Sequence, residues 1–414
     1  MASRVLETTL ATNDAFWPVE VDRLRTLLGA PDNSTLLPAH FLKVTLARIG
    51  GRALQFEVEG SIVGVGFLFP RTLDGKTQVF TLRFHRTVHA LPVDPEALSD
   101  AVRRALGGAE VVFYDADGPH HYEPTFQQLD GVNLGRPSAA EAQMIRALQA
   151  QIWGSEPDLL YPADIHSTDF GSSRSLVARV DGQVAAFLFS FFKFGGSPLP
   201  DAWQSRVRTD WRMESQTMGV DPAQRGRGLA TTLKSAQAEF ARQAGIDIVN
   251  WTADPLQWPN AVLNFGRLRA VAFEFLPDYY AFRNDLNRVA ASRVALTWLV
   301  DSPRVRRGLA GRGDEAVASL ASLGARRVNA GPEWESVDIG EATLAVEIPH
   351  NWTALQAEDP ERSVRWREST DRLLVQILGH EPGRYALTGV AEEGARRYLI
   401  AERVTQPFLE SLLA

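Results

Sequence analysis

Apolar and polar residues alternate along the middle of the chain. Some stretches have the short period that is typical of strands, and others have the longer period that is typical of helices. Asp181-Gly182 lies between two alternating runs, and an acidic residue followed by glycine at such a point indicates a β-hairpin. The expected elements are an opening strand at 131–135, a helix at 138–153, a hairpin at 174–194, a strand at 212–220, a helix at 228–244, a strand at 246–252 and a helix at 259–269. This mixture predicts an α/β fold with a mixed sheet.

The pattern occurs twice. Residues 36–70 resemble 159–194, each with a helix start at Pro-Ala and two strands around a turn of acidic residue and glycine. The stretch 109–118 resembles 246–255, since each is an apolar strand that ends in Ala-Asp. The first copy would begin with a strand at 5–11 and a helix at 16–29.

The last part of the chain has elements of its own. We expect a strand at 342–349, a helix that opens at Asp359-Pro360, and a hairpin at 384–402. These elements form either a third unit or an extension that completes the second. The expected domains are 1–130, 131–302, a linker rich in arginine and glycine at 303–335, and a C-terminal α+β extension at 336–414.

The composition of the chain argues against some classes of function. The chain has 414 residues, a net charge of -7 and no cysteine, and only four of its 43 basic residues are lysine. The acidic balance argues against nucleic-acid binding by charge, while arginine suits a small anionic ligand. Without cysteine there is no disulfide and no cysteine nucleophile. Neither a signal peptide nor a membrane span is evident, so we expect a cytoplasmic protein.

One loop carries the clearest chemical signal. Arg225, Gly226, Arg227 and Gly228 stand where a strand must give way to an amphipathic helix. Glycine lets the backbone approach a ligand closely, and the free N–H groups at a helix start favour anions. The loop matches neither the P-loop pattern nor the dinucleotide fingerprint. A solvated turn is the alternative, and 306–314 has a similar composition with no strand before it.

The pattern R-x-x-G-x-A at 225–230, after a strand that ends in Gly-Val, resembles the acetyl-CoA-binding motif of the GCN5-related N-acetyltransferase (GNAT) superfamily. The resemblance implies tandem GNAT folds that use acetyl-CoA, and it covers 131–285 well and 1–125 weakly. It assigns the CoA pyrophosphate to Arg225, Gly226, Arg227, Gly228, Leu229 and Ala230, and the pantetheine arm to Met218, Gly219 and Val220. The first copy lacks the glycine loop and has Pro92 and Pro95 there, so we expect it to be degenerate.

The candidate base is Glu214. It lies eleven positions before Arg225, as in histone-acetylating members of the family, and strand alternation would put Glu214, Gln216, Met218 and Val220 on one face. An amine of pKa about 10.4 needs roughly 4–5 kcal/mol to become neutral at pH 7, so a base is useful. The alternative is a carboxylate in a salt bridge.

A general acid is harder to find. The family often has a tyrosine where this chain has Phe265, which cannot donate a proton. Tyr279 or Tyr280 could reach the CoA thiolate, and Asn260 or Asn264 could bind CoA or the acceptor. Trp251 and Trp258 flank the end of the strand at 246–252 and could wall an acceptor pocket.

Histidines give weaker signals. His85 and His89 have the spacing of a helical metal pair but stand at a strand end without a carboxylate nearby, and His120-His121 is a solvated loop pair, so we expect no metal site.

We therefore expect an N-acetyltransferase that transfers an acetyl group from acetyl-CoA to a primary amine by direct attack in a ternary complex. The acceptor could be a small metabolite, an antibiotic, a peptide N-terminus or a lysine. The alternative is a non-catalytic acyl-CoA sensor or scaffold. The chain would be a monomer, with the tandem copies packed as a pseudo-dimer, or a homodimer; no nucleic acid and no membrane partner is expected.

Overall fold

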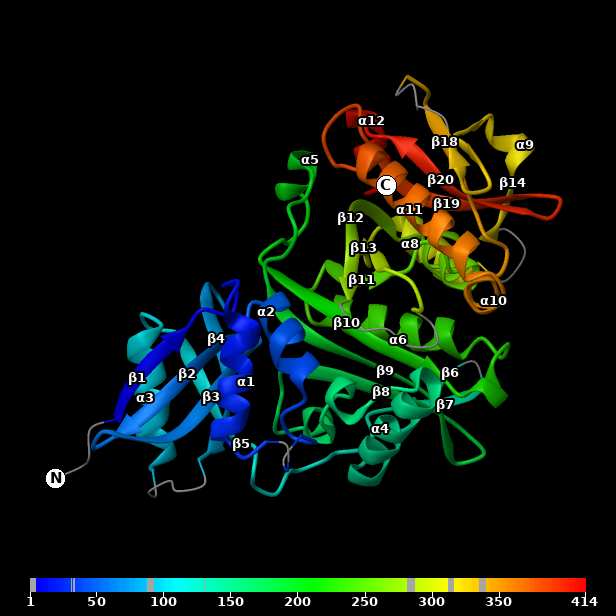
Figure 1. Ribbon diagram of the computed structural model, residues 1–414. Helices are drawn as coiled ribbons and strands as arrows, with labels where there is room; N and C mark the ends of the chain where they lie inside the picture. Colours follow the sequence, from blue (N-terminus) through cyan, green and yellow to red (C-terminus); the bar gives the residue numbers. More distant parts are fainter. Residues whose placement is uncertain are drawn as a thin grey trace. The chain divides into compact units, whose positions relative to one another are not determined.

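The computed structural model describes residues 5–30, 32, 34–87, 93–129, 131–280, 287–311, 316–334 and 340–414. The chain forms two compact units, one of residues 1–196 with 210–233 and the other of 197–209 with 234–414 (Figure 1). Each mixes helices with sheets, which confirms the predicted α/β class.

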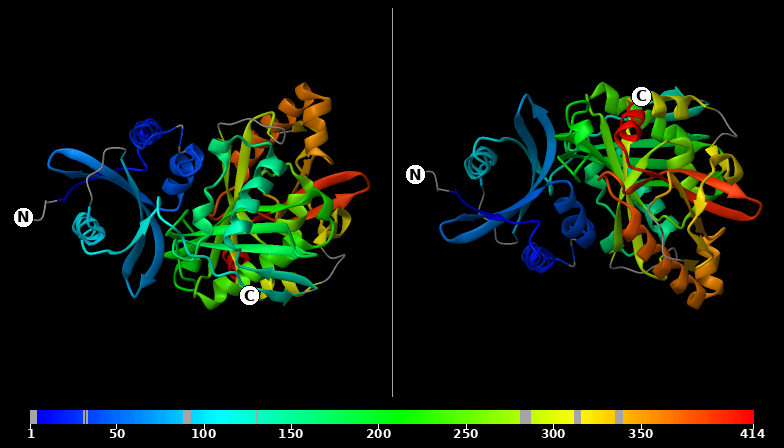
Figure 2. Two further views of the ribbon diagram at one scale, coloured as in Figure 1. Left: turned by 90° about the horizontal axis from the view of Figure 1, so that it is seen from below. Right: turned by 90° about the horizontal axis from the view of Figure 1, so that it is seen from above.

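The first unit begins with a five-stranded sheet in the order β1-β2-β3-β4-β5. Its elements are β1 (Val5–Leu10), α1 (Trp17–Leu27), the π-helix η1 (Phe41–Thr45), α2 (Leu46–Arg48), β2 (Arg52–Val58), β3 (Ser61–Asp74), β4 (Thr77–Arg86), α3 (Pro95–Ala105) and β5 (Glu110–Asp115). β1 to β4 are antiparallel neighbours, whereas β4 and β5 are parallel and joined through α3. Helices α1 and α3 lie on opposite faces of this sheet (Figure 2).

The same order of strand, helix, hairpin, strand and helix then recurs. The elements are β6 (Gln127–Leu129), β7 (Val132–Gly135), α4 (Ala139–Trp153), the 3-10 helices η2 (Pro157–Leu159) and η3 (Ala163–His166), β8 (Ser173–Val180), β9 (Gln183–Phe194), β10 (Trp211–Val220), η4 (Pro222–Gln224) and α6 (Leu229–Gln243). Neighbouring strands from β6 to β10 pair antiparallel. The capping box of Ser138 and Glu141 fixes the start of α4. The predicted helices, hairpin and strands of this region are confirmed.

The two sheets of the first unit share one hydrophobic core. Phe67 and Phe69 of β3 belong to the same buried cluster as Phe187, Phe189 and Phe191 of β9. The helices α1 and η1 of the first copy cover this side, while α3 packs in a separate cluster on the other face of the first sheet. The first and second copies are thus joined by a shared core as well as by the chain itself.

The second unit holds the rest of α6 and a sheet in the order β15-β18-β20-β19-β12-β13-β11. Its elements are α5 (Asp201–Gln204), β11 (Ile248–Ala253), α7 (Trp258–Ala261), the π-helix η5 (Val262–Arg267), β12 (Val271–Tyr280), β13 (Ala291–Leu299), α8 (Pro303–Ala310), β14 (Ala318–Ser319), α9 (Leu320–Leu323), β15 (Arg326–Arg327), β16 (Asn329–Ala330), β17 (Glu333–Trp334), β18 (Thr343–Ile348), α10 (Trp352–Glu358), α11 (Pro360–Ile377), β19 (Tyr385–Glu393), β20 (Arg396–Arg403) and α12 (Gln406–Ser411). Ala272 of β12 pairs with Leu387 of β19, so the C-terminal extension continues this sheet.

The stretch expected to be a linker begins with helix α8. Ser302 caps it by accepting from the Val305 backbone N–H, and Pro303 stands in the first turn, where its missing N–H costs nothing. Gly308 allows α8 to approach the Arg267 carbonyl, which a Cβ would meet at 2.6 Å. Residues 303–310 are therefore helical, while the linker at 303–335 and the domain boundaries at 130, 302 and 335 stay predictions.

Candidate acyl-CoA site

The loop between β10 and α6 has the backbone that an anion site requires. Gly226 and Gly228 adopt φ of +81° and +77°, in the left-handed region that side chains rarely adopt. A Cβ at either position would meet no atom within 4 Å, so the space above the loop is open. Arg225 and Arg227 are exposed beside these glycines. The amides of the first turn of α6 thus face an open and cationic surface.

A pocket of about 430 Å³ borders the loop inside the first unit. Arg227 and Leu229 line one side, and the β8–β9 turn with the β6–β7 hairpin lines the other. Arg179, which also lines it, already donates to Glu141 and to backbone carbonyls. Arg227 is therefore the more available cation of this pocket.

Strand β10 carries the residues assigned to pantetheine. Met218, Gly219 and Val220 pair with Leu188, Phe187 and Ala186 of β9. A Cβ on Gly219 would come within 2.6 Å of Phe187 and 2.7 Å of Ile152. Glycine is needed there so that α4 can pack against the strand.

An irregularity in β10 separates Glu214 from this group. The register shifts between Ser215 and Thr217, so that Gln216 is an extra residue in the ladder. Glu214 lies opposite Phe191 and Met218 opposite Leu188, and opposed residues point to the same side. Since 191 and 188 are three positions apart, Glu214 and Met218 lie on opposite faces. The expectation that Glu214, Gln216, Met218 and Val220 share one face is wrong, because the bulge breaks the period of two.

Glu214 has cations on both carboxylate oxygens. Its Oε2 lies 2.9 Å from the Lys193 Nζ, and its Oε1 forms an ion pair with Arg48 of α2. Burial lowers the pKa of the Lys193 ammonium, and the Glu214 carboxylate opposes that shift. A carboxylate held by two cations is a weak proton acceptor. This favours the salt-bridge alternative, and the base role of Glu214 stays a prediction.

The two tryptophans expected to wall the acceptor pocket differ in exposure. Trp251 is buried, its indole N–H donates to Asn264 Oδ1 at 3.3 Å, and the Lys234 ammonium lies 3.7 Å from its ring centroid. Trp258 is half-buried at the start of α7, with the Arg397 guanidinium 5.4 Å from its ring centroid. Of the two, Trp258 has the more accessible surface.

The remaining candidates lie near the ends of α7 and β12. Asn260 is exposed in α7, whereas Phe265 is buried in the core. Tyr280 is the last residue of β12, and the Arg293 guanidinium lies 4.9 Å from its ring centroid. Tyr279 packs edge-on against Tyr280. The site roles of these residues stay predictions.

The first copy lacks the glycine loop of the second. Its β4 and β5 pair in parallel without interruption from Val79 opposite Glu110 to Phe84 opposite Asp115. Between β4 and α3 the sequence has no glycine. Pro95 opens α3 behind an Asp94 cap, while Pro92 lies outside the described residues.

One histidine of the spaced pair lies in the buried part of β4. His85 is buried beside Arg83, and its proposed partner His89 lies outside the described residues. Within the described ranges, no three side chains of the metal-ligating kinds come together to hold an ion. In the same part of the chain, no helix has both the length and the apolar character to span a bilayer.

A glycine loop at a helix start, preceded by a bulged strand in a mixed sheet, defines a candidate acyltransferase site. Residues 142–258 match the model of the Acetyltransferase (GNAT) family. Residues 142–258 are therefore a GNAT acetyltransferase domain, which makes this part of the chain an acyltransferase domain. The match confirms the resemblance seen at 225–230.

Solved structures of similar fold are distant in sequence. NAA60 of Arabidopsis thaliana with a bisubstrate analogue is 15% identical, with 40% of this chain and 97% of that chain covered and a TM-score of 0.32. Ard1 of Thermoplasma volcanium is 18% identical, with 40% and 95% covered and a TM-score of 0.29. The yncA protein of Salmonella typhimurium with acetyl-CoA is 15% identical, with 41% and 95% covered and a TM-score of 0.31. A search of curated proteins returns no match.

Proposed function

We propose that the protein is an N-acetyltransferase that moves an acetyl group from acetyl-CoA to a primary amine by direct attack. The observation that carries the proposal is the open loop with Gly226 and Gly228 at the start of α6. In this assignment, residues 225–230 bind the CoA pyrophosphate, residues 218–220 bind pantetheine, and Asn260 assists. The first copy is a degenerate GNAT fold that takes no CoA, an assignment supported by the absence of glycine between β4 and α3. A cytoplasmic location stays a prediction.

The reaction forms a C–N bond and breaks a C–S bond. The neutral amine attacks the thioester carbonyl carbon, and backbone amides near Met218 to Val220 polarise the carbonyl oxygen. CoA leaves as a thiolate and takes up a proton, while the product nitrogen loses one. Tyr280 is the candidate donor for the thiolate, and Trp251 and Trp258 are candidates for the acceptor pocket.

The ion pairs of Glu214 bear on the choice of acceptor. With no strong base at this carboxylate, an amine that is already partly neutral is favoured. An α-amino group of pKa about 7.7–8.0 becomes neutral at pH 7 for about 1 kcal/mol, whereas a lysine side chain needs roughly 4–5 kcal/mol. We therefore propose an α-amine, of a peptide N-terminus or a small amino compound, as the acceptor class.

Calorimetry with acetyl-CoA tests the loop, and thiol release across a panel of amines tests turnover. Gly228→Ala should weaken acetyl-CoA binding, because the backbone must leave the left-handed region. Gly60→Ala is the matched control, since Gly60 has φ of +79° with equally open space but lies in a hairpin of the first copy. Equal affinity for both variants would overturn the proposal. Tight binding without thiol release from any amine would favour the sensor alternative.

A further inference from the structure

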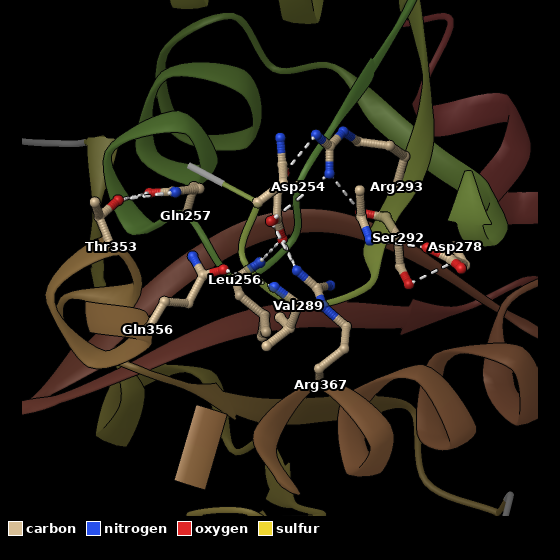
Figure 3. Close-up of polar contacts among 12 residues, drawn as sticks. Asp254, Leu256, Gln257, Asp278, Val289, Ser292, Arg293, Thr353, Gln356 and Arg367 are labelled. Carbon is tan, nitrogen blue, oxygen red and sulfur yellow. Dashed lines mark hydrogen bonds and ion pairs between the residues drawn. The ribbon is translucent and has the colours of Figure 1, made fainter. Parts of the chain in front are cut away.

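The C-terminal extension reaches the segment after β11 through a buried ion pair (Figure 3). Arg367 of α11 donates from Nη2 to both carboxylate oxygens of Asp254, at 2.8 and 2.7 Å. Arg293 of β13 lies 3.7 Å from the same carboxylate. Arg367 and Asp254 are 2% and 7% exposed, so this pair is shielded from water.

Asp254 in turn fixes the turn that leads into α7. Its Oδ1 accepts from the Leu256 backbone N–H at 2.9 Å, and its carbonyl accepts from the Gln257 N–H at 3.3 Å. The Gln257 side chain donates to Thr353 of α10 at 3.1 Å. Helix α7 then begins at Trp258 and carries Asn260. Two helices of the extension thus hold a turn directly before two candidate site residues.

Arg293 and the extension also hold both ends of the connection between β12 and β13. Arg293 lies over the Tyr280 ring and donates to Asn287 Oδ1 at 3.0 Å. Gln356 of α10 accepts from the backbone N–H groups of Arg288 and Val289 at 3.0 and 3.4 Å. The extension is therefore bound to the two places in this unit where candidate site residues gather.

The Arg367 guanidinium is only partly satisfied by hydrogen bonds. Its Nε is buried without a hydrogen-bond partner, and its Nη1 lies 3.6 Å from Oδ1 of Asp371. Buried polar atoms without partners cost free energy, and apolar residues often replace a buried ion pair without loss of stability. The pair is therefore weak evidence for a role in stability, and its place before α7 is the feature that bears on function.

We propose that Arg367 is a positioning residue for acetyl transfer: it acts through Asp254 to hold the turn 254–257, and so sets where Trp258 and Asn260 stand. This inference rests on the proposed function and gives the C-terminal extension a part in it. Arg367 contacts neither acetyl-CoA nor the acceptor in this assignment. Its effect on the reaction passes through the backbone before α7.

The test compares Arg367→Met with the matched control Arg372→Met in the full chain. Arg372 is exposed on the same helix. For Arg367→Met, we expect hydrogen exchange at 254–261 to quicken by about tenfold or more while β18 and β20 keep their protection. Acetyl-CoA affinity and kcat should fall by about 10- to 100-fold, as small displacements near a reacting centre do. Arg372→Met should change neither.

The double variant Asp254→Leu with Arg367→Met separates positioning from stability. It removes both charges, so we expect Tm to recover while exchange at 254–261 and kcat stay impaired. If activity recovers together with Tm, Arg367 is structural and the inference fails. Unchanged protection at 254–261 in Arg367→Met, with wild-type binding of acetyl-CoA intact, overturns the role of Arg367 alone. Absence of acetyl-CoA binding by the wild-type chain overturns the proposed function instead.

Discussion

The Lys193 ammonium lies 2.9 Å from the Glu214 carboxylate, and both side chains are buried in the first unit. Arg48 of the first copy pairs with the other oxygen of the same carboxylate. The residue expected to take a proton from the acceptor is thus the centre of a buried ion cluster.

Replacing Glu214 by glutamine should therefore act on stability first. Loss of one charge leaves Lys193 and Arg48 without their counter-ion, which should lower the free energy of unfolding by about 3–5 kcal/mol. Urea unfolding measures this loss, and Lys193→Met should recover part of it in the double variant. The curve of kcat/KM against pH should have the same rising and falling limbs in Glu214→Gln as in the wild-type chain. If a folded variant lost one limb, the base role of Glu214 would be supported instead.

Three histidines should make the first unit sensitive to acid, of which His85 and His166 are buried and His40 is half-buried. Burial lowers the pKa of His40, His85 and His166 to about 4, so the folded state prefers the neutral ring. With an unfolded pKa near 6.5, the unfolded state takes up protons first as pH falls, and stability is lost between pH 6.5 and 4. The loss should be at most about 2 kcal/mol for each histidine by pH 5.

Urea midpoints at pH 7 and pH 5 measure this loss. His166→Gln should reduce the difference between the two midpoints, while His121→Gln, at an exposed position, should leave it unchanged. Equal midpoints for the wild-type chain at both pH values would contradict the expectation.

The two copies should bind unequal amounts of acetyl-CoA. The first copy has no glycine between β4 and α3, so it lacks the kind of loop assigned to the CoA pyrophosphate in the second. Calorimetry should give one acetyl-CoA for each chain. A stoichiometry of two would show that the first copy binds as well.

Arg83 should not tolerate lysine. Its guanidinium is fully buried and donates to both oxygens of Asp164, at 2.9 and 3.0 Å. Lysine has no planar fork, so Arg83→Lys should cost about 3 kcal/mol or more in urea unfolding. Arg103→Lys, in an exposed pair with Asp100, should cost less than about 1 kcal/mol.

Local features of the fold were predictable from sequence because local residues determine them. Asp181-Gly182 makes a hairpin turn with both residues at positive φ, and Ser138 with Glu141 caps a helix through neighbouring backbone groups. The glycine loop was visible for the same reason. The similarity of 36–70 to 159–194 in sequence also indicated that the order of strands and helices recurs.

The partners of Glu214 and Asp254 were not predictable in this way. The bulge at Gln216 adds one residue to a ladder, and a pattern of period two does not reveal it. Arg48 and Arg367 come from elements far along the chain, and their pairing depends on packing. The only sign of Asp254 was the Ala-Asp ending shared by the two copies.

Phenylalanines of β3 and β9 lie in one core, and this limits how far the chain can be shortened from its N-terminal side. A fragment that starts at residue 131 would lose Phe41 and Phe69, which pack against Phe191, and such a fragment should aggregate on expression. The first copy would then serve as a permanent covering for its neighbour, whether or not it binds a ligand of its own.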